Sequence, residues 1–98
     1  MFVYALAKGV NEGWLSREHV PAIKKAYDGI IQNFIRADGA SRWKMLQCCS
    51  GAGLGFKNAA GQPRDGSFSY YISEPVVDND LKAVGPFILA GIEMEKLR

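Results

Sequence analysis

Apolar residues dominate the first ten positions, MFVYALAKGV, in which Lys8 is the first charge. This pattern predicts a helix over residues 1–10 that is apolar on nearly every side. Such a helix is normally covered by protein all round, so we expect this one to be buried on every side. Asn11 and Gly13 follow as residues that end helices, and Ser16 suits the N-cap of the next helix.

A second helix is predicted after Ser16. Its apolar residues fall on one face at helical spacing: Val20, Ile23, Tyr27, Ile30, Ile31 and Phe34. Polar residues, among them Lys24 and Asp28, take the other face, which indicates a surface helix with one buried stripe. Pro21 must lie in the first turn, where a missing N–H costs least.

The rest of the chain is less regular until its end. The stretch RWKMLQCC alternates weakly and predicts a short strand, and residues 50–80 form a long irregular loop in which FSYYI is a second strand candidate. Loops of this length are usually functional or packed on a larger scaffold. The final PFILAGIEMEKLR predicts an apolar helix with Pro86 at its first position. We therefore expect a mainly α protein with about three helices, a long loop and short strands.

Composition narrows the class of protein. The 98 residues are 48% hydrophobic and 22% charged, which is typical of one globular domain. The net charge of +2 comes from scattered basic residues, so neither nucleic acid nor a membrane is expected as a partner. The opening stretch lacks the basic start of a secretory signal and is too short to span a bilayer.

Three features could carry chemistry, and each has a plainer alternative. GAGLG is either a phosphate-binding loop or a tight turn, and it lacks the remaining residues of both nucleotide-binding motifs. Cys48 and Cys49 are reactive thiols or small apolar residues. His19, beside Glu18, is favoured as a surface residue, because one histidine and two adjacent cysteines do not make a tetrahedral metal site. No metal or other cofactor is expected.

The long loop also gathers carboxylates and aromatic residues. Its carboxylates are Asp65, Glu74, Asp78 and Asp80. Such groups suit glycosidase chemistry when paired, or the simpler roles of turn formation and helix capping. The aromatic candidates for stacking on a sugar are Trp14, Trp43, Tyr70 and Tyr71. Tyr70 and Tyr71 lie close to Arg64 and Asp65, a mixture that suits either a polar, acidic ligand or a structural network within the loop.

Five stretches together resemble glycoside hydrolase family 105, the unsaturated rhamnogalacturonyl hydrolases, which are related to the unsaturated glucuronyl hydrolases of family 88. They are MFVYALAKGV, KKAYDGIIQNFI, GAGLG, RDGSFSYYISEPVVDND and VGPFILAGIEME. The resemblance implies an (α/α)6 barrel of six helical hairpins. Residues 1–98 would be the C-terminal fragment of this single glycosidase domain, with an inner helix, its outer partner, a loop over the barrel mouth and a closing helix. Met1 would then be an internal methionine.

The resemblance also implies a reaction. Family members hydrate the C4=C5 double bond of a terminal unsaturated uronic acid, with an aspartic acid as general acid and base. The family's catalytic aspartates and histidine match no position here, so the fragment is expected to hold no catalytic residue and to be inactive alone. The full-length enzyme would act on unsaturated uronic-acid oligosaccharides of the pectin type, in the bacterial cytoplasm or periplasm.

Particular residues match the family's motifs. Arg64, Asp65, Tyr70 and Tyr71 match its RDGS-aromatic loop, which implies substrate binding. Asn79 and Asp80 match the ND pair before its last helix, which implies helix capping or loop ordering. The alternative is a standalone helical module without catalysis that associates with itself or with a partner chain. In either case the apolar helix faces predict a homo-oligomer.

Overall fold

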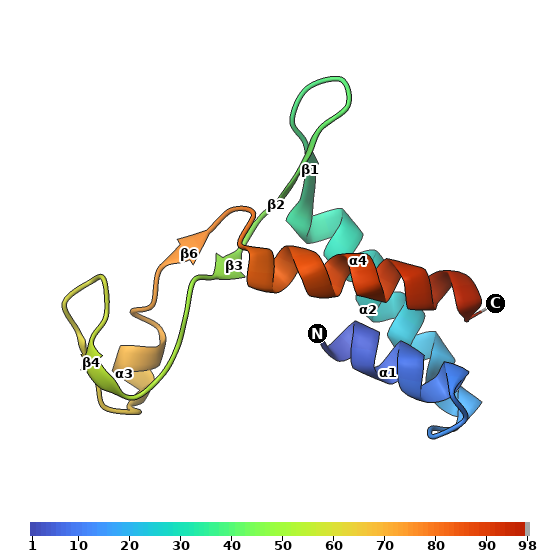
Figure 1. The fold of residues 1–98 in the computed structure, drawn as a ribbon, viewed down its shortest axis with the longest axis horizontal. Coiled ribbons are helices and arrows are strands. Elements are labelled where there is room, and N and C mark those ends of the chain that lie inside the picture. The colour runs from blue at the N-terminus through green and yellow to red at the C-terminus, as the bar shows by residue number, and fades with distance from the viewer. Residues whose placement is uncertain (98) are drawn as a thin grey trace.

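The computed structural model describes residues 1–97, and it is mainly helical, as predicted. Three helices pack together in one lobe: α1 (Phe2–Asn11), α2 (Val20–Phe34) and α4 (Leu81–Lys96) (Figure 1). A short 3-10 turn, η1 (Arg17–His19), is capped by the Ser16 hydroxyl and leads into α2. Pro21 lies in the first turn of α2, as its covalent geometry requires.

The core of this lobe lies where α1 meets α2 and α4. Its buried residues are Val3, Ala7, Val10, Ile23, Ala90 and Leu97. Beside them the Tyr27 and Phe87 rings stack with centroids 5.9 Å apart, and Asn11 donates a 2.9 Å hydrogen bond to the Glu93 carboxylate. These contacts hold α4 against both earlier helices.

Within residues 1–97, the first helix is covered on one side only, so its burial on every side stays a prediction for a larger domain or an assembly. The buried residues of α1 face α2 and α4, whereas Phe2 is 86% exposed and Leu6 is 41% exposed. The physical reason is that two neighbouring helices cover only one side of a third. The apolar pattern of α1 is therefore wider than the contacts available to it.

A hairpin follows α2 directly and projects away from the helices (Figure 1). It pairs β1 (Ile35–Ala37) with β2 (Trp43–Met45) in antiparallel register, with Ile35 opposite Met45. The predicted strand around Trp43 is thus confirmed. Alternation places Trp43 and Met45 on one face of the hairpin and Lys44 on the other.

The long loop contains more regular structure than its composition suggests. Two short strands, β3 (Cys48–Cys49) and β6 (Val76–Val77), pair in antiparallel register, with partners 29 and 27 positions apart, and lead to a second, smaller lobe. That lobe consists of β4 (Gly55–Lys57), β5 (Pro63–Arg64) and the one-turn helix α3 (Phe68–Tyr71). The prediction of a strand over FSYYI is wrong, because the Ser67 hydroxyl accepts the Tyr70 N–H and caps a helical turn.

The predicted start of the last helix is also wrong. The helix begins at Leu81, and Pro86 lies inside it. Asp80 is the N-cap and accepts the Lys82 N–H at 2.9 Å, which satisfies one of the free donors of the first turn. That cap fixes the start five residues earlier than the proline does.

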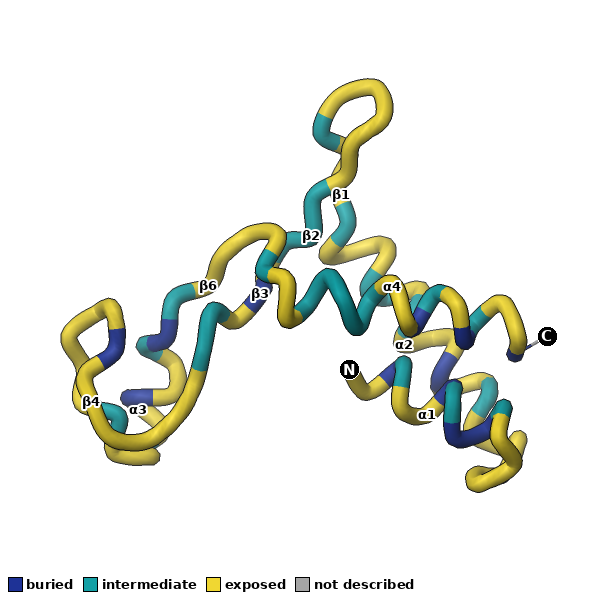
Figure 2. The backbone as a smooth tube through the Cα atoms, viewed as in Figure 1, coloured by how far each residue is buried: buried dark blue, intermediate teal, exposed yellow. Residues whose placement is uncertain are grey.

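The molecule is flat and open, with extents of 46 × 38 × 17 Å (Figure 2). Its radius of gyration is 16.1 Å, against about 13 Å for a compact domain of this length. Its accessible surface is 7000 Å², against about 5,500 Å² for a folded monomer of 10.8 kDa. Within residues 1–97, no helix has the length and apolar character needed to cross a membrane.

Candidate functional site

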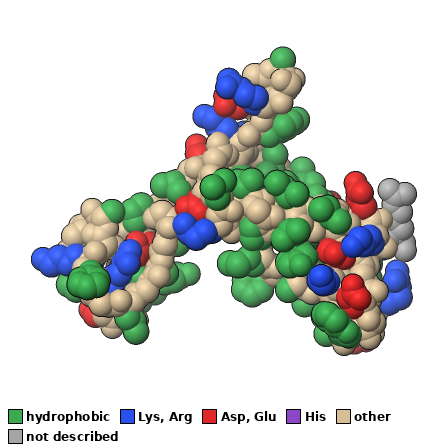
Figure 3. All heavy atoms as spheres, in the orientation of Figure 1, with side chains coloured by type: hydrophobic (Ala, Val, Ile, Leu, Met, Phe, Trp, Pro, Cys, Tyr) green, Lys and Arg blue, Asp and Glu red, His purple; other side chains and the backbone are tan. Residues whose placement is uncertain are grey.

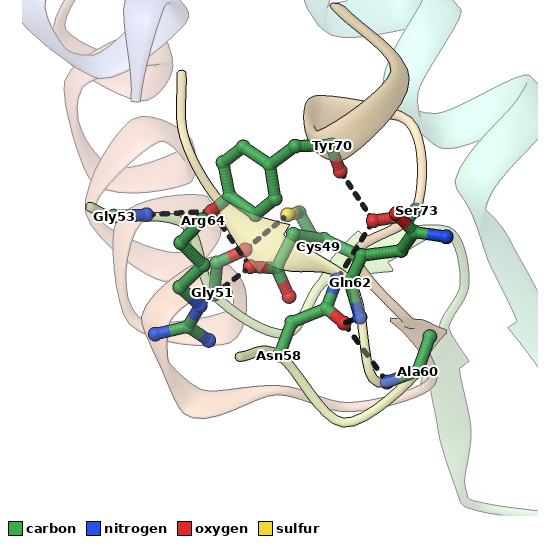
Figure 4. Close-up of polar contacts among 10 residues, drawn as sticks. Cys49, Gly51, Gly53, Asn58, Ala60, Gln62, Arg64, Tyr70 and Ser73 are labelled. Carbon is green, nitrogen blue, oxygen red and sulfur yellow. Dashed lines mark hydrogen bonds and ion pairs between the residues drawn. The ribbon is translucent and has the colours of Figure 1, made fainter. Parts of the chain in front are cut away.

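The smaller lobe is organised around the carboxylate of Glu74, whose side chain is only 3% exposed. Its Oε1 atom accepts a 2.7 Å hydrogen bond from the Tyr70 hydroxyl. The Nε atom of Arg64 lies 3.0 Å from the same oxygen without the alignment of a hydrogen bond, so this contact is an ion pair. The Tyr70 oxygen in turn accepts the Gly53 N–H at 2.8 Å (Figure 4). One carboxylate thus links the glycine-rich loop, β5 and α3.

The electrostatics of this cluster follow from burial. Burial, and then the hydrogen bond to Glu74, raise the pKa of Tyr70 above its ordinary value. The phenol therefore stays protonated and serves as a donor to Glu74. The Arg64 guanidinium compensates the buried Glu74 charge, which would be costly if left alone.

The GAGLG segment forms a turn beside this cluster. Gly55 has a φ of +109°, a left-handed conformation that favours glycine, and it pairs with Arg64 across β4 and β5. Gly53 brings its backbone N–H to Tyr70. The segment's observed interactions are those of a tight turn, the plainer of its two interpretations.

Asn58 orders the turn between β4 and β5 and was not among the predicted site residues. It is buried, and its Oδ1 atom accepts the N–H groups of Ala60 and Gln62 at 3.0 and 2.9 Å (Figure 4). Its amide donates to the Ser73 hydroxyl at 2.7 Å. The only sequence signal for this role is an Asn in a turn-forming context, which many surface loops share.

The structure brings together two of the four residues predicted to bind substrate. Arg64 and Tyr70 meet at Glu74, but Tyr70 is 4% exposed and its hydroxyl is occupied by protein groups. Asp65 is exposed and accepts the Ser67 N–H; its hydrogen bonds with Ser67 lower the pKa of the carboxyl. Tyr71 is 64% exposed and makes no side-chain hydrogen bond to residues 1–97.

Asn79 and Asp80 lie at the other end of the β3–β6 connection, where α4 begins. Asn79 has a φ of +58° and exchanges 2.8 Å hydrogen bonds with the backbone of Met45 through its side chain and its N–H. Asp80 caps α4 and lies 3.0 Å from the Lys82 ammonium. The hydrogen bond from the Lys82 backbone, followed by that from its side chain, lowers the pKa of Asp80. Both residues thus order the chain around the start of α4.

The remaining candidates do not form a site. His19 is exposed, with its Nε2 atom 4.0 Å from Glu18. Cys48 is buried, Cys49 is exposed, and both thiols are free. In the described part of the chain, no three side chains that could ligate a metal ion gather in one place.

A sizeable cavity lies in the helical lobe, away from Glu74. It measures about 610 Å³ and opens between α2, the β1–β2 hairpin and the start of α4. Its walls are mostly apolar and include Ile31, Trp43, Leu81 and Phe87. Hydrophobic side chains also gather on the surface of this lobe (Figure 3). The molecule thus has an apolar groove in one lobe and a polar cluster in the other.

Comparison with known proteins identifies the family. The family model of Glycosyl Hydrolase Family 88 matches residues 1–98. The chain belongs to this glycoside hydrolase family. A solved structure of a C. acetobutylicum ATCC 824 glycoside hydrolase from family 105 is 46% identical to this family 88 chain, with a TM-score of 0.85. The likeness covers 95% of the chain and 25% of the solved one, and it confirms the expected mainly helical fold.

Two curated proteins also resemble this family 88 chain. They are Protein Atu3128 of Agrobacterium fabrum and a 24.9 kDa protein in the picA locus of Rhizobium radiobacter. Each is 33% identical over 97 residues, which make up 95% of this chain and 41% of the relative. The chain therefore spans about two fifths of the curated relatives and a quarter of the solved structure.

Proposed function

We propose that residues 1–98 form the C-terminal part of one (α/α)6 glycosidase domain that removes unsaturated uronic acid from pectin-type oligosaccharides. The domain hydrates the C4=C5 double bond, and the unstable product opens and releases the neighbouring sugar. The observation that supports this proposal is the likeness to the family 105 structure along 95% of the chain, at 46% identity.

The polar groups of the loop support a second element of the proposal, that this chain does not catalyse alone. Glu74 is buried and paired with Arg64, Asp65 holds the Ser67 N–H, and Asp80 caps α4. A general acid and base needs a carboxyl within reach of the substrate. These three have structural partners instead, which supports the proposal that the reaction depends on groups elsewhere in the domain.

A chimera tests the proposal. Residues 1–98 replace the matching quarter of the C. acetobutylicum family 105 protein, and both proteins are assayed on unsaturated digalacturonate by loss of the double-bond absorbance. We expect turnover by the parent and the folded chimera, and none by residues 1–98 alone. A folded chimera without activity beside an active parent would contradict the proposed function, and turnover by the isolated chain would contradict its inertness.

The apolar surface supports a second proposal, that the chain alone associates with itself. Its accessible area of 7000 Å² exceeds the area of a compact monomer by about 1,500 Å², and a standard interface buries about 800 Å² on each partner. Ile88 and Ile92 on α4 are 58% and 48% exposed. Light scattering after size exclusion should give a dimer or larger species. A well-folded monomer at high concentration would refute this proposal.

A further inference from the structure

The Arg64 side chain is partly buried and partly exposed, with 31% of it accessible overall. Its Nε atom is buried and faces Glu74. The two terminal nitrogens make no hydrogen bond to residues 1–97, and they lie at the end of the side chain away from Tyr70 (Figure 4). A guanidinium held at one edge therefore leaves two parallel donors unused.

We propose that Arg64 binds a carboxylate of the substrate through these two terminal nitrogens, with Glu74 and Tyr70 as positioning residues. This inference rests on the proposed function, because an unsaturated uronide carries the carboxylate in question. The planar fork of an arginine matches a carboxylate in bidentate geometry, which a lysine at the same place would not.

The surroundings fix the fork before a ligand arrives. Glu74 is itself held by the Tyr70 hydroxyl, and Tyr70 is held by the Gly53 N–H. An arginine that is already oriented loses less rotamer freedom when it binds, so a larger part of the interaction appears as affinity.

The glycine-rich loop leaves room for the ligand. A Cβ atom at Gly53 would lie 4.0 Å from the Nη1 atom of Arg64, and nothing else lies within 4 Å of that position. A larger side chain at Gly53 would extend from this point into the space beside the fork. The glycine therefore keeps open one side of the terminal nitrogens.

The test measures ligand binding to the 98-residue chain by NMR, using the resonances of the Arg64 Nε–H and the Gly53 amide. The ligands are unsaturated digalacturonate, its dimethyl ester, and saturated digalacturonate. We expect both acids to shift these resonances and to bind about tenfold more tightly than the ester, the effect of a charge-assisted pair. Equal binding of acid and ester, or no binding at all, would overturn the carboxylate site.

The same ligands separate this inference from the proposed function. Tighter binding of the unsaturated acid than of the saturated acid supports both. Equal binding of the two acids, each tighter than the ester, supports the carboxylate site and counts against the proposed function. Inorganic phosphate serves as a further probe, and phosphate binding tighter than that of the acids would overturn the assignment to a carboxylate.

Variants test the individual roles. Arg64→Ala should abolish the preference for the acid over the ester. Arg36→Ala is the control: this variant removes the same charge from the distant β1–β2 hairpin and should keep the preference. If Arg64→Ala alone unfolds the lobe by exposing an uncompensated Glu74, the double variant Arg64→Ala/Glu74→Gln restores neutrality and should also lack the preference. A folded double variant that keeps the preference would exclude Arg64.

Glu74→Gln separates positioning from simple charge. It keeps the shape of the side chain and an acceptor for Tyr70, but it releases Arg64 and adds one unit of positive net charge. If Glu74 positions the fork, the preference for the acid falls. If the preference rises instead, Arg64 acts through its charge alone and the positioning role is wrong.

Discussion

Replacing Ile23 by alanine should remove much of the stability of the helical lobe. Ile23 is 1% exposed and belongs to the cluster that joins α2 to α1 and α4. It is one of the two largest fully buried side chains, Leu97 being the other. No other residue of α2 is buried to this extent. Val20, Tyr27 and Ile30 pack beside it as partly buried neighbours.

The expected magnitude follows from the groups removed. Three carbons at about 0.8 kcal/mol each give about 2.4 kcal/mol of lost transfer free energy. The cavity left in a core of small neighbours raises this loss to about 3–4 kcal/mol. Domains of this length are stable by about 5–15 kcal/mol, and a core this small belongs near the lower end. Ile23→Ala should therefore lower Tm by roughly 12–32 °C.

Urea unfolding followed by far-ultraviolet circular dichroism measures this loss. The control is Ile31→Ala, on the same helix with the same chemistry but 43% exposed, which should cost less than about 1 kcal/mol. Equal losses for the two variants would show that the core is not where the structure places it. Repeating both at rising protein concentration also tests self-association, because only an interface would make the Ile31→Ala loss depend on concentration.

Three further outcomes are expected. Asp80→Ala should lower Tm by removing the α4 cap, whereas Asp78→Ala, two residues earlier and outside the cap, should not. The hydrogen bond from Asn11, and then that from Lys96, lower the pKa of Glu93 below its ordinary value of 4.5. The ionised Glu93 therefore contributes its full stability above pH 4.5, and this contribution is lost as the pH falls through the folded-state pKa. Glu93→Gln should thus flatten the loss of Tm below pH 4.5, Glu95→Gln should leave it unchanged, and equal acid slopes in all three proteins would disprove the linkage. Tyr70→Phe should speed hydrogen exchange at the Gly53 amide by removing its acceptor, Tyr71→Phe should not, and unchanged exchange in the first variant would exclude that hydrogen bond.

Local patterns predicted the elements whose structure depends on local interactions. The apolar spacing of α2 and the position of Pro21 are properties of one helix, and both agree with the structure. The strand predicted over FSYYI was wrong: aromatic residues favour strands by propensity, but the N-cap at Ser67 stabilises a helical turn there. The helix start predicted at Pro86 was wrong for a similar reason: the Asp80 cap starts the helix at Leu81, before the proline.

The candidate site was harder to predict because it depends on contacts between distant segments. Arg64 and Tyr70 were singled out from their composition, but the residue that joins them, Glu74, was considered only as one loop carboxylate among several. Its four-residue spacing from Tyr70 is a weak signal, and the bond from Gly53 to Tyr70 spans 17 positions. Pairing of β3 with β6 likewise depends on residues 29 and 27 positions apart. No periodicity in a single segment carries such information.

The two lobes differ in a way that bears on how the chain works. In the smaller lobe the polar groups at Glu74 have partners within the chain, so its local order depends on residues that are present. In the helical lobe the apolar pattern of α1 exceeds what α2 and α4 cover, and Met1 and Phe2 remain more than four-fifths exposed. A surface of this kind is stabilised by further packing, whether by another part of a larger glycosidase domain or by a second copy. Binding of an acid at Arg64 should therefore be the same in the associated and the dissociated chain, whereas the stability of α1 should rise when the chain associates.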